Sequence, residues 1–139
     1  MLKFTKMHGN GNDFIVVEAD SWAEADKFQP YSVFLCQRNY GVGADGVLVV
    51  GNDKPDSIFV RVFSSDGSET GMSVNGIICA ARYAYEQRMV KNTNISVRTL
   101  TGSVSARIIT ADNEADSVQV DNEQSGNAAI VFFGAIKLR

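Results

Sequence analysis

The sequence predicts an α+β domain in which a curved, mostly antiparallel sheet wraps around one central buried helix. Three observations lead to this prediction. Residues 77–90 form an apolar run without glycine or proline, which is typical of a buried helix. Short segments of alternating or β-branched apolar residues lie on both sides of this run, as expected for strands. Turns rich in glycine, asparagine and aspartate separate most of these segments, which favours antiparallel neighbours.

Length and composition limit the class of protein. With 139 residues the chain is long enough to bury a core without metals or disulfides, so we expect one domain spanning residues 1–139. A formal net charge of -3 argues against nucleic acid or an anionic membrane as the main partner. The N-terminus lacks the apolar core of a signal peptide, and no segment approaches the roughly 20 apolar residues of a membrane span. We therefore expect a cytoplasmic protein.

The chain is expected to open with two strands. Residues 2–7 alternate between apolar and polar side chains, and residues 14–17 are apolar throughout and predict a more buried strand. The turn between them, residues 8–13, is rich in glycine and asparagine, which adopt positive φ angles at low cost. This composition fits a simple hairpin turn, and it also fits a loop that contacts a ligand. Residues 21–29 are acidic and predict a surface loop or a short turn.

The next segments combine a short helix with two strands. After Pro30, Ser32 is a suitable cap for a helix from Val33 to about Asn39, which Gly41 or Gly43 would end. The glycine loop that follows leads into a strand at residues 47–50, and residues 57–63 alternate as another strand. This loop could touch a ligand, but it lacks the strand-before, helix-after order of a dinucleotide-binding site.

The C-terminal part is expected to be all strands. Residues 95–100 and 104–109 predict a hairpin around residues 101–103, and residues 118–120 predict a short strand. Residues 129–138 predict a final strand that Gly134 interrupts. In total we expect about eight strands and two helices, without an internal repeat.

The start of the central helix is the most informative place for function. Ser73 and Asn75 are both good N-cap residues, so the helix should open there. Its first amides, around Asn75, Gly76 and Ile77, would then point unpaired toward whatever lies in front, where the helix dipole favours a carboxylate or phosphate. A glycine-rich turn before a helix often only turns the chain, so both interpretations remain open at this point.

The sequence offers little for metal or redox chemistry. Cys36 and Cys79 lie in apolar, helical surroundings and are expected to be buried free thiols. His8 is the only histidine, and no Cys-x-x-Cys or His-Glu-x-x-His spacing occurs. We therefore expect no metal and no cofactor.

Three segments of the chain form a recognisable set. They are Lys6-Met7-His8-Gly9-Asn10-Gly11-Asn12-Asp13-Phe14, then Gly41-Val42-Gly43-Ala44-Asp45-Gly46-Val47-Leu48, then Asp66-Gly67-Ser68-Glu69 with Met72-Ser73-Val74-Asn75-Gly76. In order as well as in spacing, these segments resemble diaminopimelate epimerase, in its N-terminal half. The resemblance covers Met1 to roughly Asp121.

This resemblance implies an isomerase of lysine biosynthesis that works without pyridoxal phosphate. Members of the family have two similar domains, each a sheet around a central helix, with the substrate between them. Two cysteines face opposite sides of the α-carbon, and one thiolate removes the proton while the other thiol delivers one. A thiol suits this task because a helix N-terminus lowers its pKa toward working pH. The resemblance assigns substrate contacts to Asn12, Asn75 and Gly76.

The chain departs from the family pattern at important positions. The family's Met-Cys-Gly-Asn-Gly is Met72-Ser73-Val74-Asn75-Gly76 here, so Ser73 stands at the position of the first catalytic cysteine. An unassisted serine hydroxyl is not a useful acid or base near neutral pH. Ser64 replaces an asparagine that the resemblance assigns to substrate binding, and Asn10 replaces a leucine in the opening turn.

The second half of the family pattern is missing from this sequence, including its Ala-Cys-Gly-Thr-Gly motif with the second cysteine. Residues 125–138 instead resemble the segment that ends full-length members and returns to the first domain. We therefore expect domain one joined to its own closing strand, which would cover an otherwise exposed sheet edge.

Two hypotheses about function follow. The preferred one is a single domain that is inactive alone but keeps the architecture and affinity for a small amino acid or carboxylate. The alternative is an active or residual epimerase that works as a homodimer, with the site between two copies. Under both hypotheses we expect a homodimer through the face that the missing domain would cover. Cys79 is a poor replacement thiol, because a buried apolar thiol resists ionisation.

Overall fold

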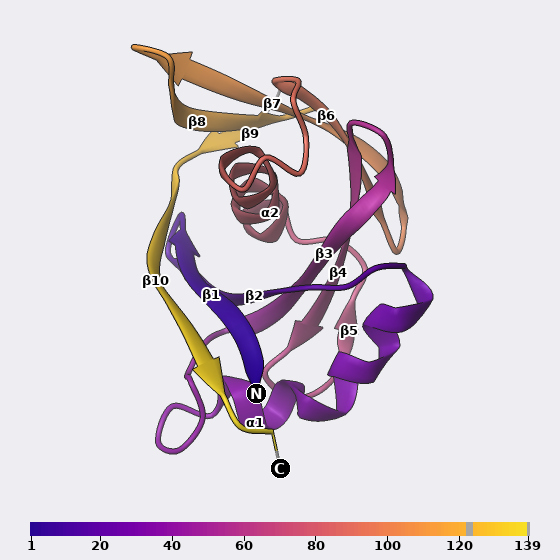
Figure 1. Ribbon diagram of the computed structural model, residues 1–139, viewed down its shortest axis with the longest axis vertical. Helices are drawn as coiled ribbons and strands as arrows, with labels where there is room; N and C mark the ends of the chain where they lie inside the picture. The colour runs from indigo at the N-terminus through magenta and orange to yellow at the C-terminus, as the bar shows by residue number, and fades with distance from the viewer. Residues whose placement is uncertain (122–123, 139) are drawn as a thin grey trace.

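The computed structural model describes residues 1–121 and 124–138, and its strands form one ten-stranded sheet. The sheet curls into a half-barrel around helix α2 (Val74–Glu86), which lies in the middle of the ring of strands (Figure 1). The expected fold class, an α+β domain with a curved sheet around a central buried helix, is confirmed. No helix in these described ranges is long and apolar enough to cross a membrane.

The sheet is mixed rather than wholly antiparallel. β2 pairs with β3 and β4 pairs with β6 in parallel, and the other neighbours are antiparallel. The order along the sheet is β10-β1-β2-β3-β4-β6-β7-β8-β9, and β5 pairs with β4 outside this path. The strands are β1 (Leu2–Gly9), β2 (Asn12–Glu18), β3 (Gly46–Lys54), β4 (Ser57–Ser64), β5 (Glu69–Thr70), β6 (Asn94–Thr99), β7 (Gly102–Ala111), β8 (Glu114–Val120), β9 (Gln124–Gly126) and β10 (Ala128–Ile136).

The two ends of the sheet are joined by one stretch of chain. β9 pairs with β8 at one end, β10 pairs with β1 at the other, and only Asn127 separates β9 from β10. In Figure 1 this stretch runs down one side of the molecule and connects the upper strands to β1. The segment that was expected to close the sheet therefore does so, and it covers the edge of β1 along nearly its whole length.

The opening turn is a tight hairpin. Gly9 pairs with Asn12, so only Asn10 and Gly11 form the loop, and their φ angles are 49° and 90°. Two consecutive positive φ angles are typical of the type I′ turn, which asparagine and glycine form most readily. The turn therefore explains the glycines and asparagines of this segment, and it leaves Asn12 as the first residue of β2.

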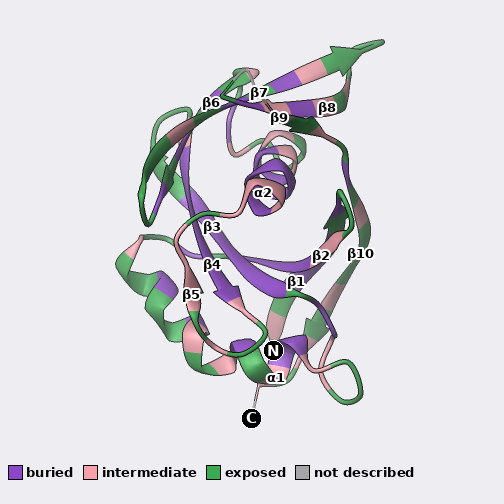
Figure 2. Cartoon of the chain, turned by 180° about the vertical axis from the view of Figure 1, so that it is seen from behind, coloured by how far each residue is buried: buried purple, intermediate pink, exposed green. Residues whose placement is uncertain are grey.

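Apolar residues pack on both faces of the sheet. On the inner face, Leu48 and Val50 of β3 pack in the same cluster as Ile77 and Ile78 of α2. On the outer face, Val47, Val49 and the neighbouring strands pack against the short helices that follow β2. This is why the sequence of β3 is continuously apolar, as expected for a strand covered on both sides. Figure 2 shows the buried residues concentrated on α2 and on the strands around it.

The segment between β2 and β3 differs from the prediction. Residues expected to form a loop include a 3-10 helix, η1 (Ala23–Tyr31), which buries Ala25 and Phe28 against the outer face of the sheet. α1 (Ser32–Cys36) ends before Asn39, the expected end, because the following loop folds back onto it. The N–H groups of Val42 and Gly43 both donate to the Leu35 carbonyl oxygen, which a longer helix would have used itself.

Gly134 does not interrupt the last strand. It pairs with Phe4 inside a continuous β10. A β-carbon at this position would come within 2.6 Å of the Phe4 ring, so the glycine allows the ring to pack across the strand. The glycine is therefore explained by a close contact, in agreement with one common role of glycine in strands.

Candidate functional site

Helix α2 begins as the sequence predicts, with Ser73 as its N-cap. Ser73 has extended backbone angles, and its Oγ accepts a hydrogen bond from the Gly76 N–H at 3.0 Å. Its carbonyl oxygen accepts the Ile77 N–H at 2.8 Å. The expectation that the amides of Gly76 and Ile77 stay unpaired is therefore wrong, because Ser73 satisfies both of them.

Two donors remain at the helix start. Among the described residues, the N–H groups of Val74 and Asn75 have no hydrogen-bond acceptor. These two groups lie at the positive end of a helix of 13 residues, where the dipole favours an anion. The unpaired amides expected from the sequence are thus those of Val74 and Asn75 rather than that of Gly76.

The side chains of Asn12 and Asn75 meet in front of the helix. Asn75 Nδ2 donates to Asn12 Oδ1 at 2.6 Å, although the two residues are separated by 63 positions in the sequence. Asn12 stands at the end of the β1–β2 hairpin and Asn75 in the first turn of α2. Two of the residues predicted to bind substrate are therefore in direct contact.

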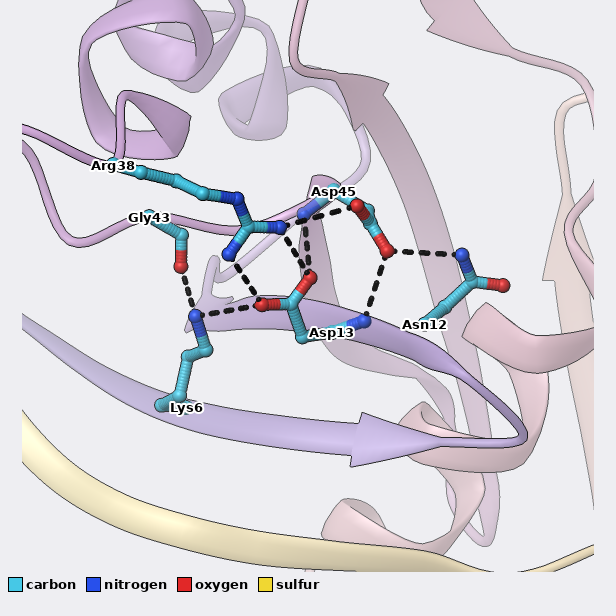
Figure 3. A network of polar contacts seen from close by, with 6 residues as sticks. All are labelled: Lys6, Asn12, Asp13, Arg38, Gly43 and Asp45. Atoms are coloured by element: carbon cyan, nitrogen blue, oxygen red, sulfur yellow. Dashed lines mark hydrogen bonds and ion pairs between the residues drawn. The ribbon is translucent and has the colours of Figure 1, made fainter.

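A network of charged groups continues from Asn12 (Figure 3). Asn12 Nδ2 donates to Asp45 Oδ2 at 3.0 Å, and Asp45 lies directly before β3. The Arg38 guanidinium binds both oxygens of Asp13, at 2.9 and 3.0 Å, and also reaches Asp45 Oδ1 at 3.3 Å. Lys6 pairs with Asp13 at 3.0 Å and donates to the Gly43 carbonyl oxygen. The network ties the hairpin to the loop that precedes β3.

Asp13 is the electrostatic centre of this network. The hydrogen bonds from Arg38 hold the pKa of its carboxyl group well below the ordinary value, and Lys6 lowers it further. Burial acts in the opposite direction but does not outweigh these cations. Asp13 therefore stays ionised and serves as an anchor, not as a proton acceptor near neutral pH.

Ser64 and Gly76 lie near this network without joining it through their side chains. The Ser64 Oγ is 2.9 Å from Thr70 Oγ1, and Ser64 pairs across the sheet with Gly46, the residue after Asp45. Gly76 packs closely against its neighbours, because a β-carbon there would lie 3.1 Å from Leu48 Cδ2 and 3.2 Å from Ser73 Oγ. The structure thus brings together Asn12, Ser73, Asn75 and Gly76 around the helix start, with Ser64 at the end of the adjoining strand.

Neither thiol of the chain is placed for acid–base chemistry. Cys79 is fully buried in the inner cluster, and burial raises its pKa to about 12. Cys36 is buried in the outer cluster, and its pKa is raised to about 11, mainly by burial and further by the charge of Asp13. Both thiols are therefore protonated at neutral pH, and the prediction of buried free thiols is confirmed.

Arg61 and Arg82 are both held in ion pairs within the fold. Arg61 binds both oxygens of Glu69 at 2.9 Å and also pairs with Asp26. Arg82 pairs with Glu86 one turn further along α2, at 2.7 Å. No group of three or more metal-ligating side chains occurs in the part of the chain that the structure describes.

Sequence reasoning missed the residues that hold Asn12 in place. Asp45, Asp13, Arg38 and Lys6 gave no signal as a cluster, because they come from separate segments. Three of them do lie in the two N-terminal segments that resemble diaminopimelate epimerase. Their position in those segments is the only sign that the sequence offers, and it leaves turn chemistry and contact with a ligand both open.

Comparison with known sequences gives a consistent result. A family profile described as diaminopimelate epimerase matches residues 4–131. Among curated proteins, the diaminopimelate epimerase of Alkaliphilus metalliredigens is 37% identical over 120 residues, which are 86% of this chain and 42% of that protein. The enzyme of Heliobacterium modesticaldum is 46% identical over 112 residues, covering 78% of this chain and 40% of that protein. The chain thus spans about two fifths of the length of these relatives.

Solved structures with the same fold include more distant proteins. A probable proline racemase from Agrobacterium radiobacter K84 superposes with a TM-score of 0.68 at 18% identity, over 86% of this chain and 41% of that chain. A predicted epimerase from Pseudomonas aeruginosa gives a TM-score of 0.65 at 16% identity, over 86% of this chain and 42% of that one. At such low identity the likeness concerns the fold alone.

Proposed function

The chain belongs to the diaminopimelate epimerase family, and on this premise we propose that it is an amino-acid-binding domain that does not epimerise its ligand by itself. The observation that carries this proposal is the hydrogen bond that the Ser73 side chain accepts. The side chain at the position of the family's catalytic thiol accepts the Gly76 N–H at 3.0 Å and so caps the helix. A hydroxyl in this role has no base beside it, because no histidine or carboxylate bonds to it among the described residues.

The remaining groups suit recognition of an α-amino acid. The N–H groups of Val74 and Asn75 can receive a carboxylate at the positive end of α2. Asn75 Nδ2 is directed to Asn12, so the Asn75 Oδ1 is left as an acceptor for an ammonium group. Donors and an acceptor side by side match the two charged groups of a zwitterion.

Loss of the thiol explains the proposed inactivity. Removing an α-proton near neutral pH requires a base whose pKa lies close to the working pH. Burial raises the pKa of Cys79 to about 12, so this thiol cannot replace the missing one. The proposal therefore separates binding, which the site retains, from proton transfer.

A direct experiment tests this function. The purified chain is incubated with meso-diaminopimelate in heavy water, and exchange of the α-protons is followed by NMR. We expect no exchange above a buffer control, together with shifts of the Val74 and Asn75 amide signals on titration. Exchange above the control would overturn the proposed inactivity, and the absence of any amide shift at millimolar ligand would overturn the proposed binding.

The variant Ser73→Cys asks whether the thiol is the limiting loss. We expect it to react with a thiol reagent at pH 8 at least about tenfold faster than Cys36 and Cys79, because a helix N-terminus lowers a thiol pKa. Ser96→Cys, on an exposed position of β6, is the matched control without the helix dipole. Equal reactivity of the two introduced thiols would show that the helix start does not activate a base.

An epimerase made of two copies is the second candidate, and one surface favours it. Met72 and Leu100 are 45% and 48% exposed. Met72 directly precedes Ser73, and Thr101, next to Leu100, lies against Gly71. These apolar side chains flank the helix start, where a second copy would complete the site.

Sedimentation of the wild type and of a Met72→Lys, Leu100→Lys double variant tests this association of two copies. A wild type that is monomeric at high concentration would contradict this association.

A further inference from the structure

The amide of Asn12 has a defined orientation that the ligand-binding groups depend on. Its Nδ2 faces Asp45 Oδ2 at 3.0 Å, and its Oδ1 faces Asn75 Nδ2 at 2.6 Å. An ionised carboxylate accepts hydrogen bonds and donates none. Only the NH₂ end of the Asn12 amide can therefore face Asp45, and the carbonyl end must face Asn75.

The orientation passes from Asn12 to Asn75. Because the Asn12 oxygen faces the helix, Asn75 has to present its NH₂ group to it. The Asn75 carbonyl oxygen then remains for a ligand, next to the unpaired N–H groups of Val74 and Asn75. If Asn12 turned over, Asn75 would have to turn as well, and the acceptor of the site would become a donor.

Asp45 is itself held from three sides. Its Oδ2 also accepts the Asp13 N–H at 3.1 Å, which belongs to β2 and cannot turn away. Its Oδ1 accepts Arg38, and its own N–H donates to Asp13 Oδ1 at 2.9 Å. Figure 3 shows the Asp45 carboxylate between the Asp13 N–H and the Asn12 amide. The carboxylate thus has a fixed place from which to orient Asn12.

We propose that Asp45 is a positioning residue for ligand binding, which sets the hydrogen-bonding direction of the Asn12–Asn75 pair without touching the ligand. This inference rests on the proposed function as an amino-acid-binding domain. It assigns a role to a residue that lies outside the helix start and two contacts away from the ligand. The other explanation is that Asp45 only fastens the loop before β3 through Arg38.

Side-chain amide NMR tests the inference in the free protein. In the wild type, one Nδ2 proton of Asn12 and one of Asn75 should exchange with water at least about tenfold more slowly than those of exposed Asn113. In Asp45→Ala, this protection should fall about tenfold at Asn75 as well as at Asn12, although Asn75 does not contact residue 45. Unprotected Asn75 protons in the wild type would overturn the proposal even if the variant did not fold.

Two further variants separate orientation from fastening of the loop. Asp45→Asn keeps one carbonyl oxygen for the Asp13 N–H and for Asn12, so we expect it to retain most of the Asn75 protection. Arg38→Met removes the guanidinium that binds Asp13 and Asp45, and it leaves the Asp45 carboxylate in place. The Arg38 side chain is 59% exposed. We expect this variant to retain the protection as well. If Arg38→Met lost the Asn75 protection as fully as Asp45→Ala, the role would be structural and the proposal would fall.

The ligand arm uses meso-diaminopimelate as the probe. We expect Asp45→Ala to weaken its binding about tenfold and Asp45→Asn to weaken it by no more than about threefold. Equal affinity of Asp45→Ala and the wild type would overturn the proposal. If the probe bound neither protein, the proposed function would fail, while the amide exchange in the free protein would still decide whether Asp45 orients the pair.

Discussion

At the scale of single residues, Ser73 supports the start of α2, and under the proposed function it also lacks the acidity that proton transfer would need. Its hydroxyl accepts the Gly76 N–H, which is the usual work of a serine N-cap. A cysteine at the same position would be a poor cap but a reactive thiol, because the dipole that favours an anion also lowers the thiol pKa. Under the proposed function, the serine therefore stabilises α2 at a position where a cysteine would supply proton transfer.

The first prediction measures this cap. Ser73→Ala should lower the free energy of unfolding by about 1 kcal/mol, because the Gly76 N–H loses its acceptor. Ser73→Asp should remain within about 0.5 kcal/mol of the wild type, since a carboxylate both caps and complements the helix dipole. Urea unfolding at 25 °C measures both, with Ser96→Ala as the exposed serine control. A Ser73→Ala variant as stable as the wild type would show that the hydroxyl does not act as a cap.

The second prediction concerns Asp13 and acid. The pKa of Asp13 is lowered in the folded protein, first by the hydrogen bonds from Arg38. Above about pH 5 to 6, well above the unfolded-state pKa of about 4, the carboxylate is ionised in both states, and its stabilising contribution is fully present. Below that, the unfolded chain binds the proton first, so the contribution is lost as the pH falls toward the folded-state pKa. We expect a loss on the order of 1 to 2 kcal/mol, because Arg38 is largely exposed to solvent.

Urea midpoints between pH 6 and pH 2.5 measure this effect. Asp13→Asn should flatten the acid side of the profile, because the group that titrates is gone. Arg38→Met should flatten it partly, because the main cause of the lowered pKa is removed while Lys6 remains. An Asp13→Asn profile as steep as that of the wild type would assign the acid sensitivity to other carboxylates.

At the scale of elements, Arg61 joins parts of the chain that the sheet alone does not hold together. It lies on β4, and its side chain is 7% exposed. It binds Glu69 of β5 with two hydrogen bonds and donates to the Trp22 carbonyl oxygen just before η1. Its guanidinium also lies 5.1 Å from the Trp22 ring centre. This single side chain therefore fixes β5, and with β5 the loop that leads to Ser73.

The third prediction follows from this burial. Arg61→Met should lower the free energy of unfolding by about 3 kcal/mol, because it leaves the Glu69 carboxylate poorly solvated and without its partner. Arg98→Met is the comparison, since Arg98 is 48% exposed, pairs with Asp53 at the longer distance of 3.4 Å and has its guanidinium 4.4 Å from the centre of the same Trp22 ring. We expect it to cost less than about 1 kcal/mol. Similar losses for the two variants in urea unfolding would mean that the Arg61 network is no stronger than a surface ion pair.

The helices and strands also show which parts of the fold could be predicted from the sequence. Helix α2 starts at Val74 behind the predicted N-cap Ser73, because an apolar run with an N-cap is a local pattern. It ends at Glu86 rather than at the end of the apolar run at Val90, and Arg88 adopts a positive φ of 60°. The hairpin of β6 and β7 was expected from a local pattern as well. η1 was not predicted, because acidic residues dominate the charged side chains of its segment. Its apolar side becomes clear only from the burial of Ala25 and Phe28 against the outer face of the sheet.

The candidate site could be predicted only in part, for a related reason. Ser73 and Gly76 are neighbours in the sequence, so their contact follows from capping rules. Asn12 and Asp45 are 33 positions apart, and they meet because β2 and β3 pair in parallel from Phe14 and Gly46 onward. Local patterns favoured antiparallel neighbours and carry no information about this register. Long-range pairing therefore decides which polar residues share the site.

At the scale of the whole molecule, the fold depends on closing the sheet around α2. β10 supplies antiparallel partners for β1 from Leu2 to Gly9, and β9 does the same for part of β8. Ala128 and Ile130 of β10 also pack into the inner cluster around the helix. An open sheet would leave the edge of β1 and one side of this cluster in water, which favours aggregation. Closure by a single stretch of chain therefore completes both the sheet and the core.

The fourth prediction is that this stretch is indispensable for the native state. A chain ending at Asp121 should lose cooperative unfolding, because β1 loses its outer partner and the inner cluster loses Ala128 and Ile130. A chain ending at Ile136 keeps β10 whole and is the matched control. For the control, we expect well-dispersed amide NMR signals and a sharp unfolding transition in urea. For the shorter chain, we expect poorly dispersed amide signals and increased self-association. If the shorter chain gave a native spectrum, the helix and the remaining strands would suffice, and closure would add stability without determining the fold.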